Sequence, residues 1–312
     1  MAPFVRNAQR TISVLVLVLM GHAAAAGEPT QTPEVLDDLL LLPTIEFEYE
    51  PSDPLAKRAA LRTANESYSL LNDTVSDFWN ISISPIHWRT RQWLLFLGVA
   101  GTTTGLIYLA DEDVREAALD NGHFQRFGND IQALGRGPAL IAVTGGFLVS
   151  GMIFRDKELQ TGKMLIEASL ISQGYSIFLK RAIGRKRPGP LGPRYFKPWS
   201  NEFSLPSGET TNAFTVAAVV SEQYPNWPVR LLSYGLASSI AAGRIATDDH
   251  WTSDVFVGAV LGTFVGRSVA HLHQERDRRA LERKRLGLEK EAYRPRHFFA
   301  VSSRGFRWTV RF

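Results

Sequence analysis

Three short blocks between residues 180 and 254 contain the side chains best suited to chemistry. They read KRAIGRKRP from Lys180 to Pro188, PSGE from Pro206 to Glu209, and GRIATDDHWTSD from Gly243 to Asp254. Together the blocks supply basic side chains, a hydroxyl beside a glycine, and a histidine followed by a carboxylate. We interpret the rest of the chain as the scaffold that positions these three blocks.

The first block places two cations at helical spacing. Lys180 and Arg187 are seven residues apart, so on a continuous helix both side chains would project from one face. Pro188 is expected to end that helix, because the residue before a proline disfavours the helical conformation. The block therefore predicts a helix end that carries two cations.

The second block is expected to lie at a helix start. Pro206, Ser207 and Gly208 precede residues 210–220, a segment of small and apolar side chains that is typical of a helix. Backbone amides at a helix start, helped by the Ser207 hydroxyl, make an anion site.

The third block places a carboxylate near a histidine. His250 and Asp254 are four residues apart, one above the other on a helix face, where the carboxylate can hold the imidazole in one tautomer. Arg244 adds a planar fork suited to phosphate oxygens. With the other blocks, this describes a phosphoryl-transfer site with a histidine nucleophile, a chemistry that needs no metal.

The order and spacing of these residues resemble the signature of the type 2 phosphatidic acid phosphatases and the vanadium-dependent haloperoxidases. That signature is Lys-x6-Arg-Pro, then Pro-Ser-Gly-His, then Ser-Arg-x5-His-x3-Asp. Here it stands as Lys180, Arg187 and Pro188, then Pro206 to Glu209, then Gly243, Arg244, His250 and Asp254. The resemblance covers residues 90–275 and implies an all-α, six-helix bundle.

The resemblance also implies a role for each matching residue. His250 would attack phosphorus to give a phosphohistidine, and Asp254 would orient the imidazole. The phosphate oxygens would be held by Lys180, Arg187, Ser207, Gly208 and Arg244. No cofactor and no metal are implied, and vanadate would bind only as a phosphate mimic.

Two positions depart from the family pattern, Gly243 in place of Ser and Glu209 in place of the His that protonates the leaving group. An unperturbed glutamate titrates near about 4.3, and three neighbouring cations are expected to lower the pKa of Glu209 further, which makes a poor acid. Burial would reverse this by raising the pKa. Alternatively, a diphosphate substrate would need less protonation, or activity would be lost and phosphate binding retained.

The two ends of the chain have their own signals. Residues 1–26 are typical of a secretory signal peptide, with two arginines, a short apolar core and small residues for cleavage. We assign residues 27–92 to an N-terminal extension, 93–275 to the phosphatase domain and 276–312 to a basic tail with a C-terminal strand. The chain has a formal charge of +4 and no cysteine, so disulfides play no part in the fold.

Two segments alternate in the manner of β-strands. Residues 44–50 alternate apolar and acidic side chains, and residues 306–312 alternate apolar and basic ones. Opposite charges across an antiparallel pair are favourable, so we predict that these two segments pair beside the helical core.

Six apolar segments are predicted as helices, at residues 93–110, 138–154, 164–179, 210–220, 229–242 and 255–269. A bilayer span needs about 20 largely apolar residues, and the first two nearly qualify. The cations at residues 89, 91 and 276–296 are expected to face the cytoplasm, with the acidic loop of residues 111–130 and the three blocks outside. A cleaved signal, six full spans and an external site are mutually inconsistent, so one of these three assumptions must fail.

We predict a phosphatase of the bacterial envelope, embedded in the membrane with a periplasm-facing site and acting on a lipid phosphate or diphosphate. Three alternatives remain: a soluble periplasmic acid phosphatase acting on small phosphomonoesters, a vanadate-dependent haloperoxidase, and a catalytically inactive phosphate- or lipid-binding protein. Residues 276–296 are interpreted as a helix continuing at a membrane surface, not as a site for nucleic acid.

Overall fold

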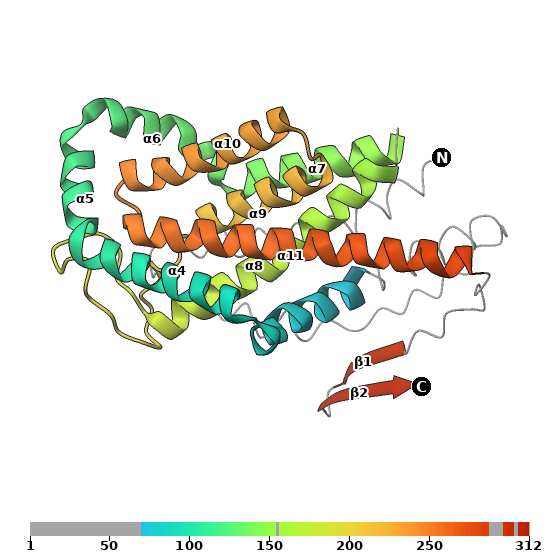
Figure 1. Cartoon of the computed structure of the whole chain (residues 1–312). Coiled ribbons are helices and arrows are strands. Elements are labelled where there is room, and N and C mark those ends of the chain that lie inside the picture. Colours follow the sequence, from blue (N-terminus) through green and yellow to red (C-terminus); the bar gives the residue numbers. More distant parts are fainter. Residues whose placement is uncertain (1–69, 154–155, 287–295, 303–304, 312) are drawn as a thin grey trace. The chain divides into compact units, whose positions relative to one another are not determined.

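The computed structural model describes residues 70–153, 156–286, 296–302 and 305–311 (Figure 1). All of them belong to one unit, Ser67–Phe312. The predicted signal peptide and the predicted acidic strand lie outside the described residues.

The predicted all-α fold and its six apolar helices are confirmed. The helices are α4 (Thr90–Leu109), α7 (Gly137–Ile153), α8 (Asp156–Ile183), α9 (Gly208–Gln223), α10 (Trp227–Ala246) and α11 (Thr252–Arg285). Most run longer than predicted because polar turns extend their apolar middles. The start of the basic tail is such an extension, since α11 continues as helix to Arg285.

The acidic loop predicted at residues 111–130 is wrong, because this stretch forms the helices α5 (Asp111–Asp120) and α6 (Gly122–Gly135). Three of the acidic side chains, Asp111, Glu112 and Asp113, stand in the first turn of α5, where carboxylates interact favourably with the helix dipole. Asn121 separates the helices, and its side chain accepts hydrogen bonds from two amides at the start of α6. Residues 70–83 also form a helix, which was not predicted.

Helices α9 and α11 pack at close range through a glycine stripe, Gly258, Gly262 and Gly266. A Cβ added at Gly262 would lie 2.1 Å from the carbonyl oxygen of Thr211 on α9, and the other two glycines face α9 in the same way. Larger side chains would force the two backbones apart. This contact fixes the starts of α9 and α11 beside each other.

The main hydrophobic cluster joins four helices. Residues 70–83 contribute Ile81, α8 contributes Leu165, α9 contributes Val219, and α11 contributes Val265 and Val269. A second cluster joins α9 to α10, with a partly buried side chain of α6 packed against it. Helix α9 contributes to both clusters and so connects α10 to the cluster formed by α8, α11 and the helix at residues 70–83.

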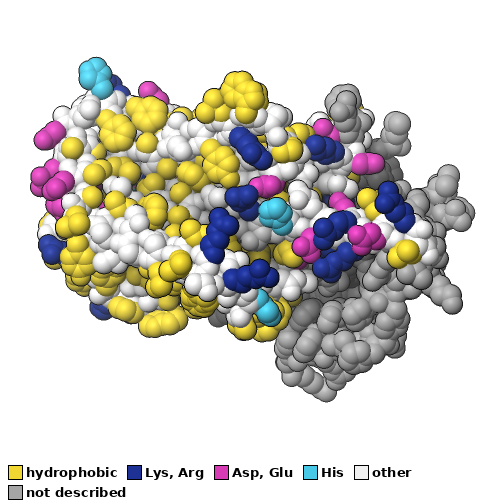
Figure 2. All heavy atoms as spheres, in the orientation of Figure 1, with side chains coloured by type: hydrophobic (Ala, Val, Ile, Leu, Met, Phe, Trp, Pro, Cys, Tyr) yellow, Lys and Arg dark blue, Asp and Glu magenta, His cyan; other side chains and the backbone are white. Residues whose placement is uncertain are grey.

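Among the described residues, two helices are long and apolar enough to cross a membrane, α4 and the part of α11 at Thr252–Glu282. The pair α6 and α7, bent by 47°, would make a third span. Length and composition therefore do not support six full spans. Figure 2 shows hydrophobic side chains spread over the half of the bundle that contains α4, and no part of the apolar window of α4 is buried. Such a surface is typical of a membrane protein.

The C-terminal residues form an antiparallel hairpin of β1 (Arg296–Ser302) and β2 (Gly305–Arg311), with Val301 opposite Phe306. The predicted C-terminal strand is confirmed, although its partner in the described residues is β1, which was not predicted. The pairing with residues 44–50 stays a prediction, because that segment lies outside the described residues.

Candidate active site

The three predicted blocks meet where four helices end or begin. The amide of Ser207, just before α9, donates a hydrogen bond to the carbonyl oxygen of Asp254 in α11 at 3.0 Å. A Cβ on Gly208 would lie 3.8 Å from Cε of Lys180, near the end of α8. The structure therefore brings the second block into contact with both of the others.

His250 and Asp254 are in contact but do not share a helix face. Helix α11 begins at Thr252, so His250 lies on the turn before it and Asp254 in its first turn. Nδ1 of His250 lies 3.4 Å from Oδ2 of Asp254. With a proton on Nδ1, the lone pair of Nε2 is left free. Burial lowers the pKa of His250 to about 4, so the imidazole is unprotonated at neutral pH.

Asp254 is held from several sides. Nη1 of Arg185 lies 2.6 Å from its Oδ1. The Ser204 hydroxyl and the Trp251 amide donate to its Oδ2, at 2.5 and 3.1 Å. The carboxylate is buried, and these contacts fix the orientation of the oxygen that faces His250.

Arg185 was not predicted as a site residue, yet it is fully buried at the centre of this contact. Its Nη2 donates to Asp111 Oδ2 at 2.7 Å, and its Nε donates to the carbonyl of Pro193 at 2.9 Å. Asp111 also accepts from the amide and the hydroxyl of Ser253, at 2.9 and 2.6 Å. We name Asp111, Arg185, Ser253 and Asp254 the buried arginine network. It ties α5 and the loop after α8 to the start of α11.

The first block does not form one continuous helix, so this prediction is wrong. Helix α8 ends before Gly184, which has a φ of +59°, and a Cβ there would lie 1.8 Å from the carbonyl oxygen of Lys197. Glycine is the residue that tolerates such a position. The helix therefore ends at Ile183, five residues before Pro188, with Lys180 on the helix and Arg187 on the following loop.

Lys180 and the start of α9 form one wall of the site. Nζ of Lys180 donates to the carbonyl of Phe203 at 2.7 Å, and burial, followed by the nearby arginines, lowers the pKa of Lys180 to about 8. Ser207 stands at the N-cap of α9, but its side chain makes no cap hydrogen bond. The first amides of α9 therefore keep their capacity to bind an anion.

Arg244 divides its guanidinium between two carboxylates. Nη1 lies 2.7 Å from Glu209 Oε2, and Nη2 lies 2.9 Å from Asp249 Oδ2. Asp249, which was not predicted, also lies 3.6 Å from Nη1 of the exposed Arg187. The two predicted phosphate-binding arginines are thus linked through one carboxylate that directly precedes His250.

A family model matches the part of the chain that contains this site. The sequence model of the PAP2 superfamily matches residues 162–278, a range that contains all of the predicted site residues. This part of the chain is similar to the PAP2 superfamily. The PAP2 segment begins within α8 and ends within α11, so it spans the four helices whose ends meet at His250.

Two curated relatives are similar to parts of the chain. Lipid A 1-phosphatase of Porphyromonas gingivalis is 26% identical over 167 residues, which are 52% of this chain and 34% of that protein. An acid phosphatase of Zymomonas mobilis is 35% identical over 88 residues, which are 28% of this chain and 31% of that protein. The chain therefore spans about a third of the length of the curated relatives it matches.

Two solved structures are also similar. The crystal structure of Aquifex aeolicus LpxE shares 26% identity, covers 51% of this chain and 93% of its own, and has a TM-score of 0.42. The transmembrane PAP2 type phosphatidylglycerolphosphate phosphatase from Bacillus subtilis shares 22% identity, covers 59% and 94%, and has a TM-score of 0.45.

Glu209, the residue that departs from the PAP2 pattern, is a better acid than its neighbouring cations suggest. Burial raises the pKa of Glu209 and outweighs the opposing effect of Arg244, so the predicted lowering is wrong in sign. Part of this burial comes from α6, because a Cβ on Gly135 would lie 3.3 Å from Glu209 Oε2.

Gly243, the other departure within the PAP2 segment, has a packing explanation. A Cβ at this position would lie 2.5 Å from Cγ2 of Ile131 on α6. Gly128 of α6 is equally close to α10, since its Cβ would lie 2.6 Å from that of Ala246. The glycine thus allows α6 to pack on α10 and to reach Glu209.

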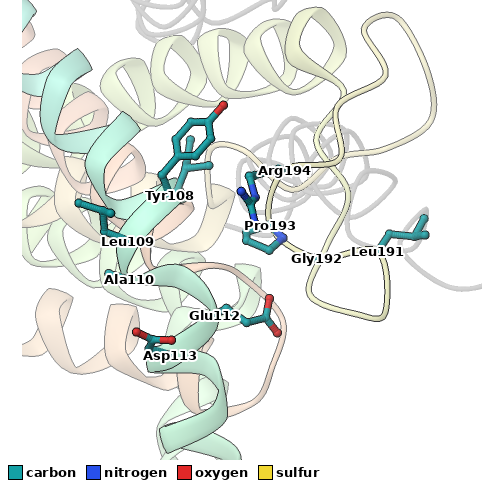
Figure 3. A pocket seen from close by; sticks show the side chains of 10 residues that line it. Tyr108, Leu109, Ala110, Glu112, Asp113, Leu191, Gly192, Pro193 and Arg194 are labelled. Atoms are coloured by element: carbon teal, nitrogen blue, oxygen red, sulfur yellow. The ribbon is translucent and has the colours of Figure 1, made fainter.

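A polar cavity of about 260 Å³ adjoins the buried arginine network (Figure 3). It lies where α4 meets α5 and faces the loop of residues 191–194. The Arg194 guanidinium lies 5.6 Å from the centre of the Tyr108 ring, and Pro193, whose carbonyl accepts from Arg185, forms part of the wall. The cavity therefore opens beside the network at one end of a candidate membrane span.

Proposed function

We propose that this chain is a phosphatase that removes phosphate from a lipid phosphate or lipid diphosphate through a phosphohistidine at His250. The observation that carries the proposal is the buried, unprotonated His250, whose Nδ1 faces Asp254 beside Arg244 and the start of α9. The exposed apolar surface of α4 supports a lipid substrate, as do the names of the lipid phosphatases to which the chain is similar.

In the first step, Nε2 of His250 attacks phosphorus. The P–N bond forms while the bond from phosphorus to the leaving oxygen breaks. The imidazole becomes positively charged, and Asp254, held by Arg185, stabilises that charge. Lys180, Arg244 and the amides of α9 stabilise the charge that develops on the other phosphate oxygens.

Glu209 is proposed as the proton donor to the leaving group. An alkoxide leaving group takes the carboxyl proton of Glu209, whose pKa is raised by burial. A diphosphate substrate releases a lipid monophosphate, which needs less protonation. The proposal therefore favours a lipid diphosphate at neutral pH and extends to monophosphates at acid pH.

In the second step, water attacks the phosphohistidine. The Glu209 carboxylate accepts the proton of that water, the P–N bond breaks, and inorganic phosphate leaves with the original imidazole restored. The residues present supply every proton transfer, so we route no step through a metal or cofactor. Vanadate is proposed only as an inhibitor that mimics the pentacoordinate phosphate.

We further propose a location in the bacterial envelope, with α4 and α11 in the membrane and the site facing the periplasm. Because the chain contains no cysteine, single cysteines can report the topology. Asn201→Cys lies in an exposed loop on the site side, and Arg285→Cys lies at the other end of α11. A membrane-impermeant maleimide should label the first in intact spheroplasts and the second only after permeabilisation; the reverse pattern contradicts the proposed orientation.

Phosphate release by the purified chain in detergent tests the activity. Lipid diphosphate and lipid monophosphate would be compared from pH 4 to 8, with His250→Asn as the inactive variant and the exposed His271→Asn as its control. We expect release that is abolished in the first variant only. Folded protein that releases no phosphate from either lipid refutes the proposal and favours a phosphate-binding protein. Activity confined to water-soluble phosphomonoesters favours an acid phosphatase.

A further inference from the structure

A second set of buried ionisable side chains joins three helices. Asp77 of the helix at residues 70–83 and Glu167 of α8 are almost fully buried, and His273 of α11 is 20% exposed. One ligand atom from each of the three lies within 4.8 Å of the others. Glu167 precedes Lys180 by thirteen residues on the same helix, which is about 20 Å at 1.5 Å per residue, so the set is separate from the active site.

The contacts within the set are tight, and its surroundings are apolar. Nε2 of His273 lies 2.6 Å from Glu167 Oε2, and Arg276 pairs with Asp77. The same turns of the three helices carry residues of the main hydrophobic cluster. A shell of this kind excludes water and strengthens the electrostatic interactions inside it.

The carboxylates are not fully satisfied by these contacts. Glu167 Oε1 and Asp77 Oδ2 are buried without a hydrogen-bond partner, whereas Asp77 Oδ1 pairs with Arg276. The Arg276 guanidinium pairs with one of the two carboxylates, that of Asp77. Buried polar atoms without partners cost free energy unless a further group binds them.

We propose that Asp77, Glu167 and His273 bind a divalent transition-metal ion, with Zn²⁺ as the best match. One imidazole and two carboxylates suit Zn²⁺, which accepts three protein ligands and a water, whereas Mg²⁺ and Ca²⁺ prefer oxygen ligands throughout. Arg276 would stay in contact with Asp77 and orient it from the second coordination shell. The ion would clip the helix at residues 70–83 to α8 and α11, and its role would be structural.

The competing interpretation is a pair of ion pairs, Asp77 with Arg276 and Glu167 with a protonated His273. That arrangement leaves Glu167 Oε1 without a partner, whereas a bound ion satisfies it. The two interpretations differ in whether the protein binds one metal ion per chain.

Metal binding by the tag-free full-length chain in detergent tests the proposal. After treatment with EDTA, addition of Co²⁺ should produce visible absorption bands that Zn²⁺ bleaches, and mass spectrometry should find one bound Zn²⁺ per chain. At 100 times the Kd, Zn²⁺ should raise the melting temperature by about 5–10 °C. Binding should be lost in Glu167→Gln and His273→Gln, and retained in His271→Gln and in His250→Asn.

No cobalt bands and no stoichiometric zinc in the unmodified chain would overturn the proposal. Binding that survives in both Glu167→Gln and His273→Gln would place the ion elsewhere and overturn it equally. His273→Gln keeps the test informative if the fully buried Glu167 cannot be replaced without unfolding, because His273 is partly exposed. Loss of phosphatase activity does not enter the test, so the two proposals fail independently.

Discussion

Replacement of Arg185 by methionine is expected to destabilise the candidate site strongly. The guanidinium lies 2.6 Å from Asp254 and 2.7 Å from Asp111, and all three side chains are fully buried. Methionine keeps an apolar stem but leaves both carboxylates without their cation, and breaking a buried pair in this way costs about 3–5 kcal/mol. At about 2–4 °C per kcal/mol, the melting temperature should fall by roughly 6–20 °C.

Circular dichroism melts of the purified chain in detergent measure this cost. Neutralising one carboxylate in the same chain, as Arg185→Met with Asp111→Asn, should recover part of the loss, with a coupling of about 0.5–3 kcal/mol. Arg185→Lys keeps the positive charge but cannot donate to two carboxylates at once. Its melting temperature should therefore lie between those of the unmodified chain and Arg185→Met. The control is Arg181→Met in the same block. Because the Arg181 side chain is exposed, this substitution should change the free energy of unfolding by about 0.5 kcal/mol or less.

Two results would refute this reasoning. If Arg185→Met melts within two degrees of the unmodified chain, the buried arginine network does not stabilise the fold. If the costs of Arg185→Met and Asp111→Asn add fully, the two side chains do not act as a unit. In a folded Arg185→Lys variant, kcat should fall by a larger factor than KM changes, because Asp254 would then orient His250 less well.

Three further predictions concern the histidine, the acid and the helix packing. His250 has a pKa of about 4 when folded against 6.5 when unfolded, so the unfolded chain binds the proton first as the pH falls. The stability that His250 contributes is complete above pH 6.5 and should decline by up to about 3 kcal/mol toward pH 4, a loss that denaturation of His250→Asn should not show. Glu209→His should raise the rate on a lipid monophosphate relative to a diphosphate by about 10-fold or more at neutral pH; an unchanged ratio from pH 5 to 8 contradicts Glu209 as the acid. Gly262→Ala should cost about 1–3 kcal/mol because its Cβ would meet the α9 backbone, whereas Gly105→Ala in the open surface of α4 should be neutral or stabilising in the same melts.

The parts of the site that depend on residues close together in the chain were predictable from sequence. Ser207 and Gly208 mark the start of α9 through their own chain neighbours, and His250 with Asp254 keeps a fixed short spacing. The details that failed depend on distant backbone. The carbonyl of Lys197 packs against Gly184, where α8 ends. The sequence of the first block gives no indication of that contact.

The buried arginine network had no sequence signal of comparable strength. Arg185 lies inside a conspicuous basic block, but only the fold shows that it is buried among carboxylates and its neighbour Arg181 is not. Asp111 stands 74 residues earlier, in an acidic stretch that is also typical of a solvated loop. The set of Asp77, Glu167 and His273 is invisible for the same reason, because its members come from three separate helices.

The glycine stripe on α11 limits how this site can be re-engineered. Gly258, Gly262 and Gly266 hold α11 against α9. The start of α11, which follows the nucleophile, and the start of α9, which binds the anion, therefore form one rigid unit. Libraries that vary these three glycines would mainly yield unfolded protein, since a Cβ added at each would lie within 2.8 Å of a backbone oxygen at the start of α9 or within it. Substrate range is better diversified at exposed positions of the loop after α8, such as Leu191 and Arg194, which line the cavity and do not belong to the buried arginine network.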